Sequence, residues 1–210
     1  MTVPEVSEVD DPARTAVRRA AREVREVAFR ALVATGVSGG EAAAAAEAVL
    51  WAEGADGSGI AALLAELGRP RLPSFLDRDG EPVVVSGDGP LLLGPHVVDL
   101  AVALGRPVSA PRLALTAVLE SFARTAAVHS GVALRLTSED RCSLVTSGGR
   151  VFRVDGRAAG LLAVRLPADP EIPAGSTEIG CPALPDGLRV AAGPWAAAYA
   201  ASRRFLVPEG

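Results

Sequence analysis

Few residues of this chain can move protons or bind metals, because its 210 residues include only two histidines and two cysteines. His96 and Asp99 stand three residues apart in a stretch expected to be helical, which places them close enough to pair. A general base is one interpretation, and a surface or capping pair is the favoured one. His129 falls near an expected helix end, where the helix dipole favours its charged form; a structural role is favoured here too.

The two cysteines lack the spacing of a zinc site relative to the histidines, so no metal site is predicted. Cys142, beside Asp140 and Arg141, is read either as an activated thiol or as a small buried strand residue, the commoner state. Cys181 lies in a Pro- and Gly-rich stretch, the kind of loop where functional residues concentrate. The acidic N-terminus lacks the apolar segment of a secretion signal, so reduced thiols in a cytoplasmic protein are favoured over a disulfide.

Arginines are the remaining candidates for chemistry, and the candidates in the stretch 131–166 are Arg135, Arg141, Arg150 and Arg153. A guanidinium group can bind a carboxylate through two parallel hydrogen bonds, so this set is a candidate carboxylate-binding site. The chain contains no lysine. Schiff-base chemistry, pyridoxal phosphate anchoring and a Walker lysine are therefore excluded.

Composition excludes further classes of protein. The chain is 49% hydrophobic and 22% charged, with a net charge of −4. Without a basic patch to neutralise phosphates, nucleic acid is not an expected partner. No run of eighteen apolar residues occurs without charge, glycine or proline, so no membrane span is expected.

The stretch from Ser38 to Leu67 predicts two helices, near 41–53 and 58–67. Ser38 and Glu41 have the spacing of a capping box, in which the hydroxyl and the carboxylate bind free amides at the helix start. Glycines at 54 and 57 are expected to interrupt the first helix. Ser58 is placed to cap the second helix.

The rest of the first half is also expected to be mainly helical, after a disordered tail over residues 1–10. Asp11 and Pro12 have the types of a helix start, and Ser109 and Pro111 are taken to begin a later helix. The expected elements are a helix over 12–35, a strand over 83–86, a helix over 91–104 and a helix over 112–129, with a buried strand over 113–119 as the alternative.

From Gly131 onward the apolar residues alternate with a period of two, which is typical of strands. Ser147–Gly149 has the composition of a hairpin turn. Antiparallel strands are therefore expected within 131–166, followed by a loop over 167–187, a return to the sheet at 188–192 and a helix over 194–204. The prediction is an α+β fold with a helical N-terminal half packed on an antiparallel β-meander and a C-terminal helix. It forms one domain over 11–207, with a helical part (11–130) and a meander part (131–207).

Two family resemblances follow from these motifs. Trp51, Gly54–Gly57, Pro90–Pro95 and Ala201–Arg203 resemble the recurring features of an uncharacterised bacterial family of similar length, a domain of unknown function. That resemblance covers most of the chain and implies no activity.

The second resemblance is to the N-terminal part of the malate/L-lactate dehydrogenase type 2 family, which uses a nicotinamide cofactor and includes imine reductases. It rests on the segment from Ala31 to Leu67 and on VVVSGDGPLLLGPHVVDLAVAL, which begins at Val83. That family's Ser-His-Gly-x-x-Arg motif matches Gly57–Gly59 here, with Ala61 or Ala62 at the arginine. Its second histidine matches Ser121.

The resemblance therefore implies that the ancestral chemistry is lost, since a serine hydroxyl cannot deliver a proton near neutral pH and alanine cannot hold a carboxylate. Ser58 and Ser121 join His96 and Asp99 as candidate catalytic positions. The favoured hypothesis is a noncatalytic small-molecule-binding or partner subunit, a homo-oligomer or part of a hetero-complex, with no cofactor and no expected use of NAD(P)H. The alternative is an enzyme of altered chemistry that binds a small carboxylate through the arginines of the 131–166 stretch.

Overall fold

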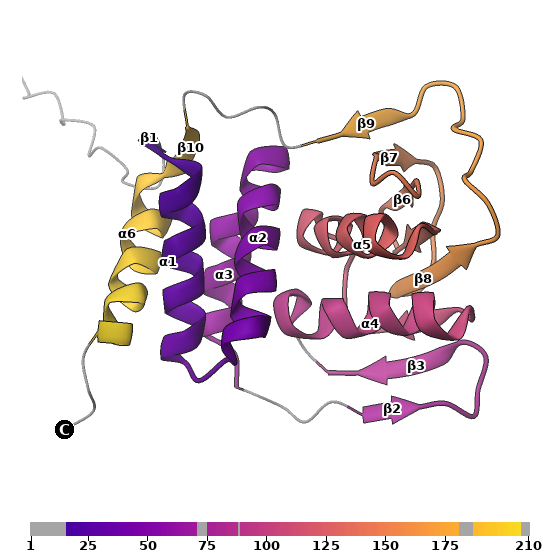
Figure 1. Cartoon of the computed structure of the whole chain (residues 1–210), viewed down its shortest axis with the longest axis horizontal. Helices are drawn as coiled ribbons and strands as arrows, with labels where there is room; N and C mark the ends of the chain where they lie inside the picture. The colour runs from indigo at the N-terminus through magenta and orange to yellow at the C-terminus, as the bar shows by residue number, and fades with distance from the viewer. Residues whose placement is uncertain (1–15, 71–74, 88, 181–186, 207–210) are drawn as a thin grey trace, which may run out of the picture.

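The computed structural model describes residues 16–70, 75–87, 89–180 and 187–206. Three consecutive helices near the start of the chain and six consecutive strands in its second half make an α+β fold with a C-terminal helix, as predicted (Figure 1). The elements are β1 (Ala16–Arg19), α1 (Ala21–Ala34), α2 (Gly39–Asp56), α3 (Gly59–Leu67), β2 (Phe75–Asp77), β3 (Val83–Ser86), α4 (Pro90–Leu104), β4 (Val108–Ala110), α5 (Ala117–Ser130), β5 (Ala133–Thr137), β6 (Cys142–Val145), β7 (Val151–Val154), β8 (Leu161–Leu166), β9 (Thr177–Ile179), β10 (Leu188–Ala191), α6 (Ala192–Arg203) and the 3-10 helix η1 (Arg204–Leu206).

The main sheet has the strand order β2-β3-β4-β8-β5-β6-β7-β9. The predicted antiparallel strands within 131–166 are confirmed, since β5, β6, β7 and β8 pair only in antiparallel fashion with one another. β8 pairs with β5 and not with its neighbour in sequence, β7. The sheet also extends into the first half of the chain, where β3 and β4 form a parallel pair.

The helices form two groups. α4 and α5 lie together against the sheet, and α1, α2, α3 and α6 form a bundle beside it (Figure 1). α2 joins the groups, because it packs against both α1 and α5. The expected helix over 91–104 is confirmed as α4, with Pro95 inside it.

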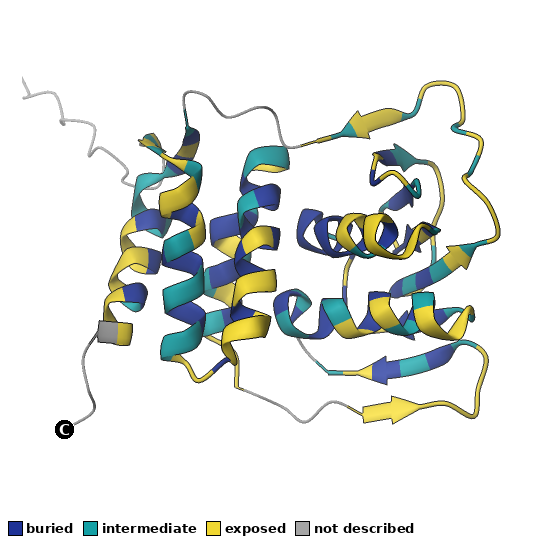
Figure 2. Ribbon diagram, in the orientation of Figure 1, coloured by how far each residue is buried: buried dark blue, intermediate teal, exposed yellow. Residues whose placement is uncertain are grey.

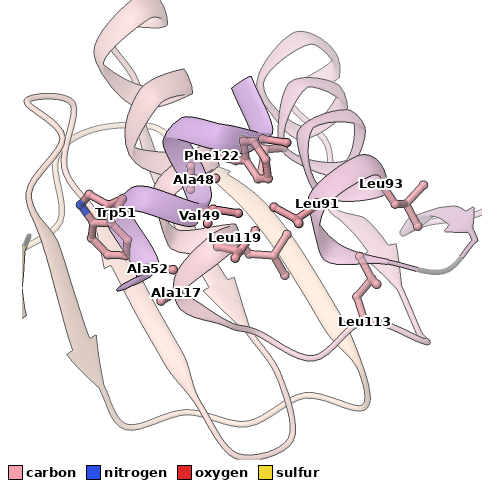
Figure 3. Close-up of a cluster of buried hydrophobic side chains, with 14 of the residues drawn as sticks. Ala48, Val49, Trp51, Ala52, Leu91, Leu93, Leu113, Ala117, Leu119 and Phe122 are labelled. Atoms are coloured by element: carbon pink, nitrogen blue, oxygen red, sulfur yellow. The ribbon is translucent and has the colours of Figure 1, made fainter. Parts of the chain in front are cut away.

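A continuous apolar core joins the bundle to the sheet. Val49 and Ala52 of α2 lie in one cluster with Leu91 of α4 and with Leu119 and Phe122 of α5 (Figure 3). Buried residues line the inward sides of the helices, and exposed residues cover their outer sides (Figure 2). Among the described helices, none is long and apolar enough to cross a membrane.

The start of the first helix differs from the prediction. Residues 16–19 form β1, which pairs antiparallel with β10, and α1 begins only at Ala21. Val17 lies opposite the fully buried Val190, and the Arg19 guanidinium lies 5.2 Å from the Trp195 ring centroid. These contacts come from the far end of the chain and outweigh a local helical pattern. The predicted tail and the Asp11–Pro12 start lie outside the described residues.

Two other predictions, the helix start at Ser109 and the sheet to which 188–192 belongs, are wrong. Ser109 does not start a helix: it lies in β4, between Val84 of β3 and Leu162 of β8. The strand expected at 188–192 exists as β10, but it pairs with β1 in a separate two-stranded sheet. In both cases pairing with distant strands decides the conformation of a segment too short to show a period.

The cap of α3 also differs from the prediction. Ser38 caps α2 as expected, accepting a hydrogen bond from the Glu41 N–H. α2 continues through Gly54 to Asp56, and Ser58 caps nothing with its side chain. The buried Glu53 carboxylate caps α3 instead, because it accepts a hydrogen bond from the Ile60 N–H over 2.8 Å. A carboxylate at a helix N-terminus is favoured by the free amides and by the helix dipole.

Candidate functional site

Charged side chains from three elements meet where the end of α2 and the start of α5 face the sheet. We call Asp56 of α2, Glu120 of α5, Ser143 of β6 and Arg153 of β7 the Glu120 network. The Ser143 hydroxyl donates to Glu120 Oε1 over 2.6 Å. Arg153 Nη2 lies 3.3 Å from Glu120 Oε2 and 3.3 Å from Asp56 Oδ2. One arginine therefore bridges two carboxylates from different helices.

Burial makes this pairing obligatory for Glu120, whose side chain is fully buried, whereas the side chains of Arg153 and Asp56 are 28% and 26% exposed. Burial by itself lowers the pKa of Arg153. Hydrogen bonding and attraction to Glu120, followed by those to Asp56, outweigh it, so the pKa of Arg153 is raised above its ordinary value. A carboxylate removed from water must be paired to remain charged. Arg153 is therefore held as the counter-ion of Glu120.

Two more of the predicted site residues converge on Asp56. The Ser58 hydroxyl donates to Asp56 Oδ1 over 2.5 Å, and Arg141 Nη1 lies 4.0 Å from Asp56 Oδ2. The structure thus brings together Ser58, Arg141 and Arg153. All three bind a carboxylate of the protein itself.

Ser121 lies on α5 next to Glu120 and is only 5% exposed. Ala61 is exposed on α3, and Ala62 is partly buried there. The positions to which the dehydrogenase resemblance assigns two histidines and an arginine therefore hold a serine bound to Asp56, a buried serine and an alanine. The Arg153 guanidinium is still present in this region, but it is bound within the Glu120 network.

Sequence reasoning missed Asp56, Glu120 and Ser143. One signal was available for Glu120, since it interrupts the apolar run Ala117–Ala123, and a carboxylate on a helix face that must be buried requires a partner. Its partners lie on β6 and β7, more than twenty residues away. Nothing local identifies them.

Arg150 is placed elsewhere, at the exposed edge of the sheet. Its Nε and Nη2 donate to the two carboxylate oxygens of Glu178 in β9, over 2.9 and 2.6 Å. The same guanidinium lies 4.8 Å from the Phe152 ring centroid. Hydrogen bonding to Glu178 raises the pKa of Arg150, and the hydrogen bond from Arg150 lowers that of Glu178. This pair fastens β9 to β7.

Arg135 faces the side of the sheet opposite α4 and α5. Its neighbours in β5, Leu134 and Leu136, are fully buried in the core, so alternation turns Arg135 the other way. It lies opposite Leu144 of β6 and Val164 of β8. All three residues line a cavity of about 1060 Å³.

This cavity, which we call the sheet cavity, lies between strands β5 to β8 and the loops 155–158 and 167–176. Arg157 also lines it, as do Asp155 and Glu171. Neither Arg135 nor Arg157 has an acidic partner among the described residues. The sheet cavity therefore presents two cations that no carboxylate of the described residues neutralises by direct contact.

One side of the covering loop is fixed by Asp169. Its carboxylate accepts from the Ser147 backbone N–H over 2.6 Å and from the Ser147 hydroxyl over 2.8 Å. Those two hydrogen bonds lower the pKa of Asp169. The loop after β8 is thereby tied to the turn between β6 and β7.

Of the remaining candidates, His96, Asp99 and His129 lie apart from both places, whereas Cys142 lines the sheet cavity. His96 and Asp99 are exposed on α4 and line a smaller cavity next to β2. His129 is exposed in the last turn of α5. Cys142 is a free, buried thiol 3.5 Å from the Thr137 hydroxyl, which fits the interpretation as a small strand residue, and Cys181 lies outside the described residues. No group of three or more metal-binding side chains occurs in the described part of the chain.

Comparison with known proteins places the fold but not the activity. No family model and no curated protein matches the sequence. The structure is similar to that of malate dehydrogenase from Pyrococcus horikoshii OT3, with a TM-score of 0.51 and 16% identity over 72% of this chain and 52% of that one. Malate dehydrogenase from Entamoeba histolytica also matches, at a TM-score of 0.45 and 12% identity over 72% of this chain and 49% of that one.

The match to the Pyrococcus enzyme shows a dehydrogenase-like fold over most of the described chain. It agrees with the resemblance drawn from the sequence, at the level of fold alone. The chain spans about half the length of the malate dehydrogenases it matches.

Proposed function

We propose that this chain is a noncatalytic small-molecule-binding subunit that keeps a dehydrogenase-like fold without hydride-transfer chemistry. The observation that carries the proposal is the Glu120 network. Arg153 shares Asp56 with Ser58 of the lost motif, and it is bound to Glu120 and Asp56. Neither Ser58 nor the buried Ser121 can act as a general acid near neutral pH.

The proposed ligand is a small carboxylate bound in the sheet cavity by Arg135 and Arg157. These two arginines lack acidic partners among the described residues, whereas Arg150 and Arg153 are each paired with glutamate. Guanidinium groups bind carboxylates through paired, charge-assisted hydrogen bonds. The apolar side chains of Leu144 and Val164 provide the walls against which the rest of the ligand packs.

The first test is catalytic. The protein is expected not to oxidise NADH or NADPH in the presence of 2-oxo acids or cyclic imines, as followed by the absorbance of the reduced cofactor. Losing a general acid alone costs roughly 10²–10⁴-fold in rate. Turnover within about tenfold of the ~10 s⁻¹ that is common for enzymes would contradict the proposal.

The second part of the test is binding. Succinate is expected to bind and its neutral counterpart succinamide is not, as measured by calorimetry. Arg135→Met removes the charge but keeps a long side chain, and it is expected to weaken succinate binding about tenfold or more. Arg150→Met, which removes an arginine outside the sheet cavity, serves as the control. Equal binding of succinate by the wild type and Arg135→Met would refute the assignment.

The alternative, an enzyme of altered chemistry, would bind its carboxylate through the same cavity. It differs in one outcome, which is conversion of the bound carboxylate over time, followed by NMR of the ligand. The expected homo-oligomer or hetero-complex stays a prediction, which light scattering at micromolar concentration tests.

A further inference from the structure

A second cavity, separate from the sheet cavity, lies between α4 and the hairpin of β2 and β3. Its volume is about 410 Å³, within the range of about 300–1,000 Å³ that small-molecule sites typically occupy. Its walls are mainly apolar and include Phe75 and Leu76 of β2 and Leu93 and Leu100 of α4. His96 and Asp99 are the polar residues that line it. We call it the α4 cavity.

Its apolar wall is unusually open to water. Phe75 is 69% exposed and Leu76 is 39% exposed. β2 is an edge strand of the sheet, and all three of its residues are exposed (Figure 2). A ligand lying between β2 and α4 would remove this apolar surface from water, which is the main favourable term in binding of this kind.

The two polar residues define what else the ligand needs. His96 and Asp99 are three residues apart on α4, so both face the same side of the helix. Neither has a hydrogen-bond or ion-pair partner among the described residues, and no arginine lines the cavity. The Asp99 carboxylate accepts hydrogen bonds only, and an imidazole nitrogen can accept another. The α4 cavity therefore presents acceptors and a negative charge beside an apolar wall.

We propose that the α4 cavity binds a small apolar amine. The protonated amine donates to the Asp99 carboxylate, and His96 accepts a second of its N–H bonds. The hydrocarbon or aromatic body lies against Phe75, Leu76 and Leu100. A carboxylate of the same size is disfavoured here, because its charge would lie next to that of Asp99.

This selectivity is opposite to that of the sheet cavity, where Arg135 and Arg157 favour an anion. The two sites involve different residues and different probes. Failure of amine binding would leave the carboxylate proposal intact, and the reverse also holds.

The experiment titrates phenethylamine into the full 210-residue chain. Titration is followed by amide chemical shifts in ¹⁵N-labelled protein and by calorimetry. Shifts are expected to concentrate at Leu76, His96, Asp99 and Leu100. Phenylpropionate, which has the same body and the opposite charge, is expected to bind at least tenfold more weakly.

Asp99→Asn removes the charge and keeps the shape of the side chain. It is expected to weaken phenethylamine binding about tenfold or more, in line with the loss of a charge-assisted hydrogen bond. Asp77→Asn is the matched control: it makes the same change on β2 outside the lining residues and keeps an acceptor for the Asp79 N–H. It is expected to bind like the wild type.

Phe75→Ala supplies an independent variant on the opposite wall. Because Phe75 is mostly exposed, its loss is not expected to unfold the protein, and circular dichroism checks this. The proposal is overturned if phenethylamine causes no shifts in the α4 cavity up to its solubility limit. It is also overturned if Asp99→Asn binds the amine as tightly as the wild type, or if phenylpropionate binds equally well.

Discussion

Replacing Arg153 by methionine is expected to lower the free energy of unfolding by about 3 kcal/mol. The substitution leaves the Glu120 carboxylate without its cation in a place where its side chain is 0% exposed. Breaking a buried ion pair on one side typically costs about 3–5 kcal/mol. The lower end applies, because the Arg153 side chain is 28% exposed and water can replace part of what it provides.

A double variant separates the charge from the packing. In Arg153→Met with Glu120→Gln, the glutamine keeps an oxygen for the Ser143 hydroxyl but carries no charge. Replacing a whole buried ion pair by uncharged groups is often close to neutral, so the double variant is expected to lie within about 1 kcal/mol of the wild type. Arg150→Met is the matched control, since its partner Glu178 is exposed, and it is expected to shift the unfolding midpoint far less.

The assay is urea unfolding followed by circular dichroism and by the fluorescence of Trp51 and Trp195, both of which are buried. A loss of about 3 kcal/mol corresponds to a fall in the thermal midpoint of roughly 6–12 °C for a chain of this size. The reasoning is refuted if the double variant is as unstable as Arg153→Met alone. The loss would then come from the packing of the arginine side chain and not from an unpaired carboxylate.

Two further predictions concern the junction of α2 and α3. Gly59→Ala is expected to cost about 3 kcal/mol of unfolding free energy, because an added Cβ would lie 2.0 Å from the Val49 carbonyl oxygen. At Gly40 an added Cβ would have no neighbour within 4 Å, so Gly40→Ala is expected to be neutral or stabilising by up to about 1 kcal/mol. Urea unfolding of both variants measures the difference. Equal losses of stability would contradict the close approach of the two helices. Burial raises the pKa of Glu53 above 4.5, so the folded protein holds this proton more tightly than the unfolded chain, and stability falls as pH rises from 4.5 through the folded pKa. Glu53→Gln is expected to remove this fall in stability, and the control Glu47→Gln is expected to keep it. The measurement is the urea unfolding midpoint at pH values from below to well above 4.5. Identical pH profiles for the two variants would contradict the assignment to Glu53.

Local physics was sufficient for much of the helical part and for the strand pairs of the second half. Ser38 with Glu41 marked the start of α2, because the capping bonds involve residues three apart. Alternation of apolar residues after Gly131 identified β5, and the turn composition at Ser147–Gly149 identified the hairpin of β6 and β7. Each of these signals lies within a few residues of the feature it predicts. The likeness to a dehydrogenase fold also came from linear motifs.

Tertiary structure decided what depends on distant partners. Residues 16–19 became a strand because β10 lies beside them, and the cap of α3 came from Glu53, seven residues before the amide it binds. The candidate site shows the same division. The sequence named Arg153 and Ser58 by residue type, but only the fold showed that Arg153 is held by Glu120 and Asp56, while Arg135 is left without an acidic partner in the described chain. Residue type limits what a side chain can bind, and burial with long-range pairing decides what it does bind.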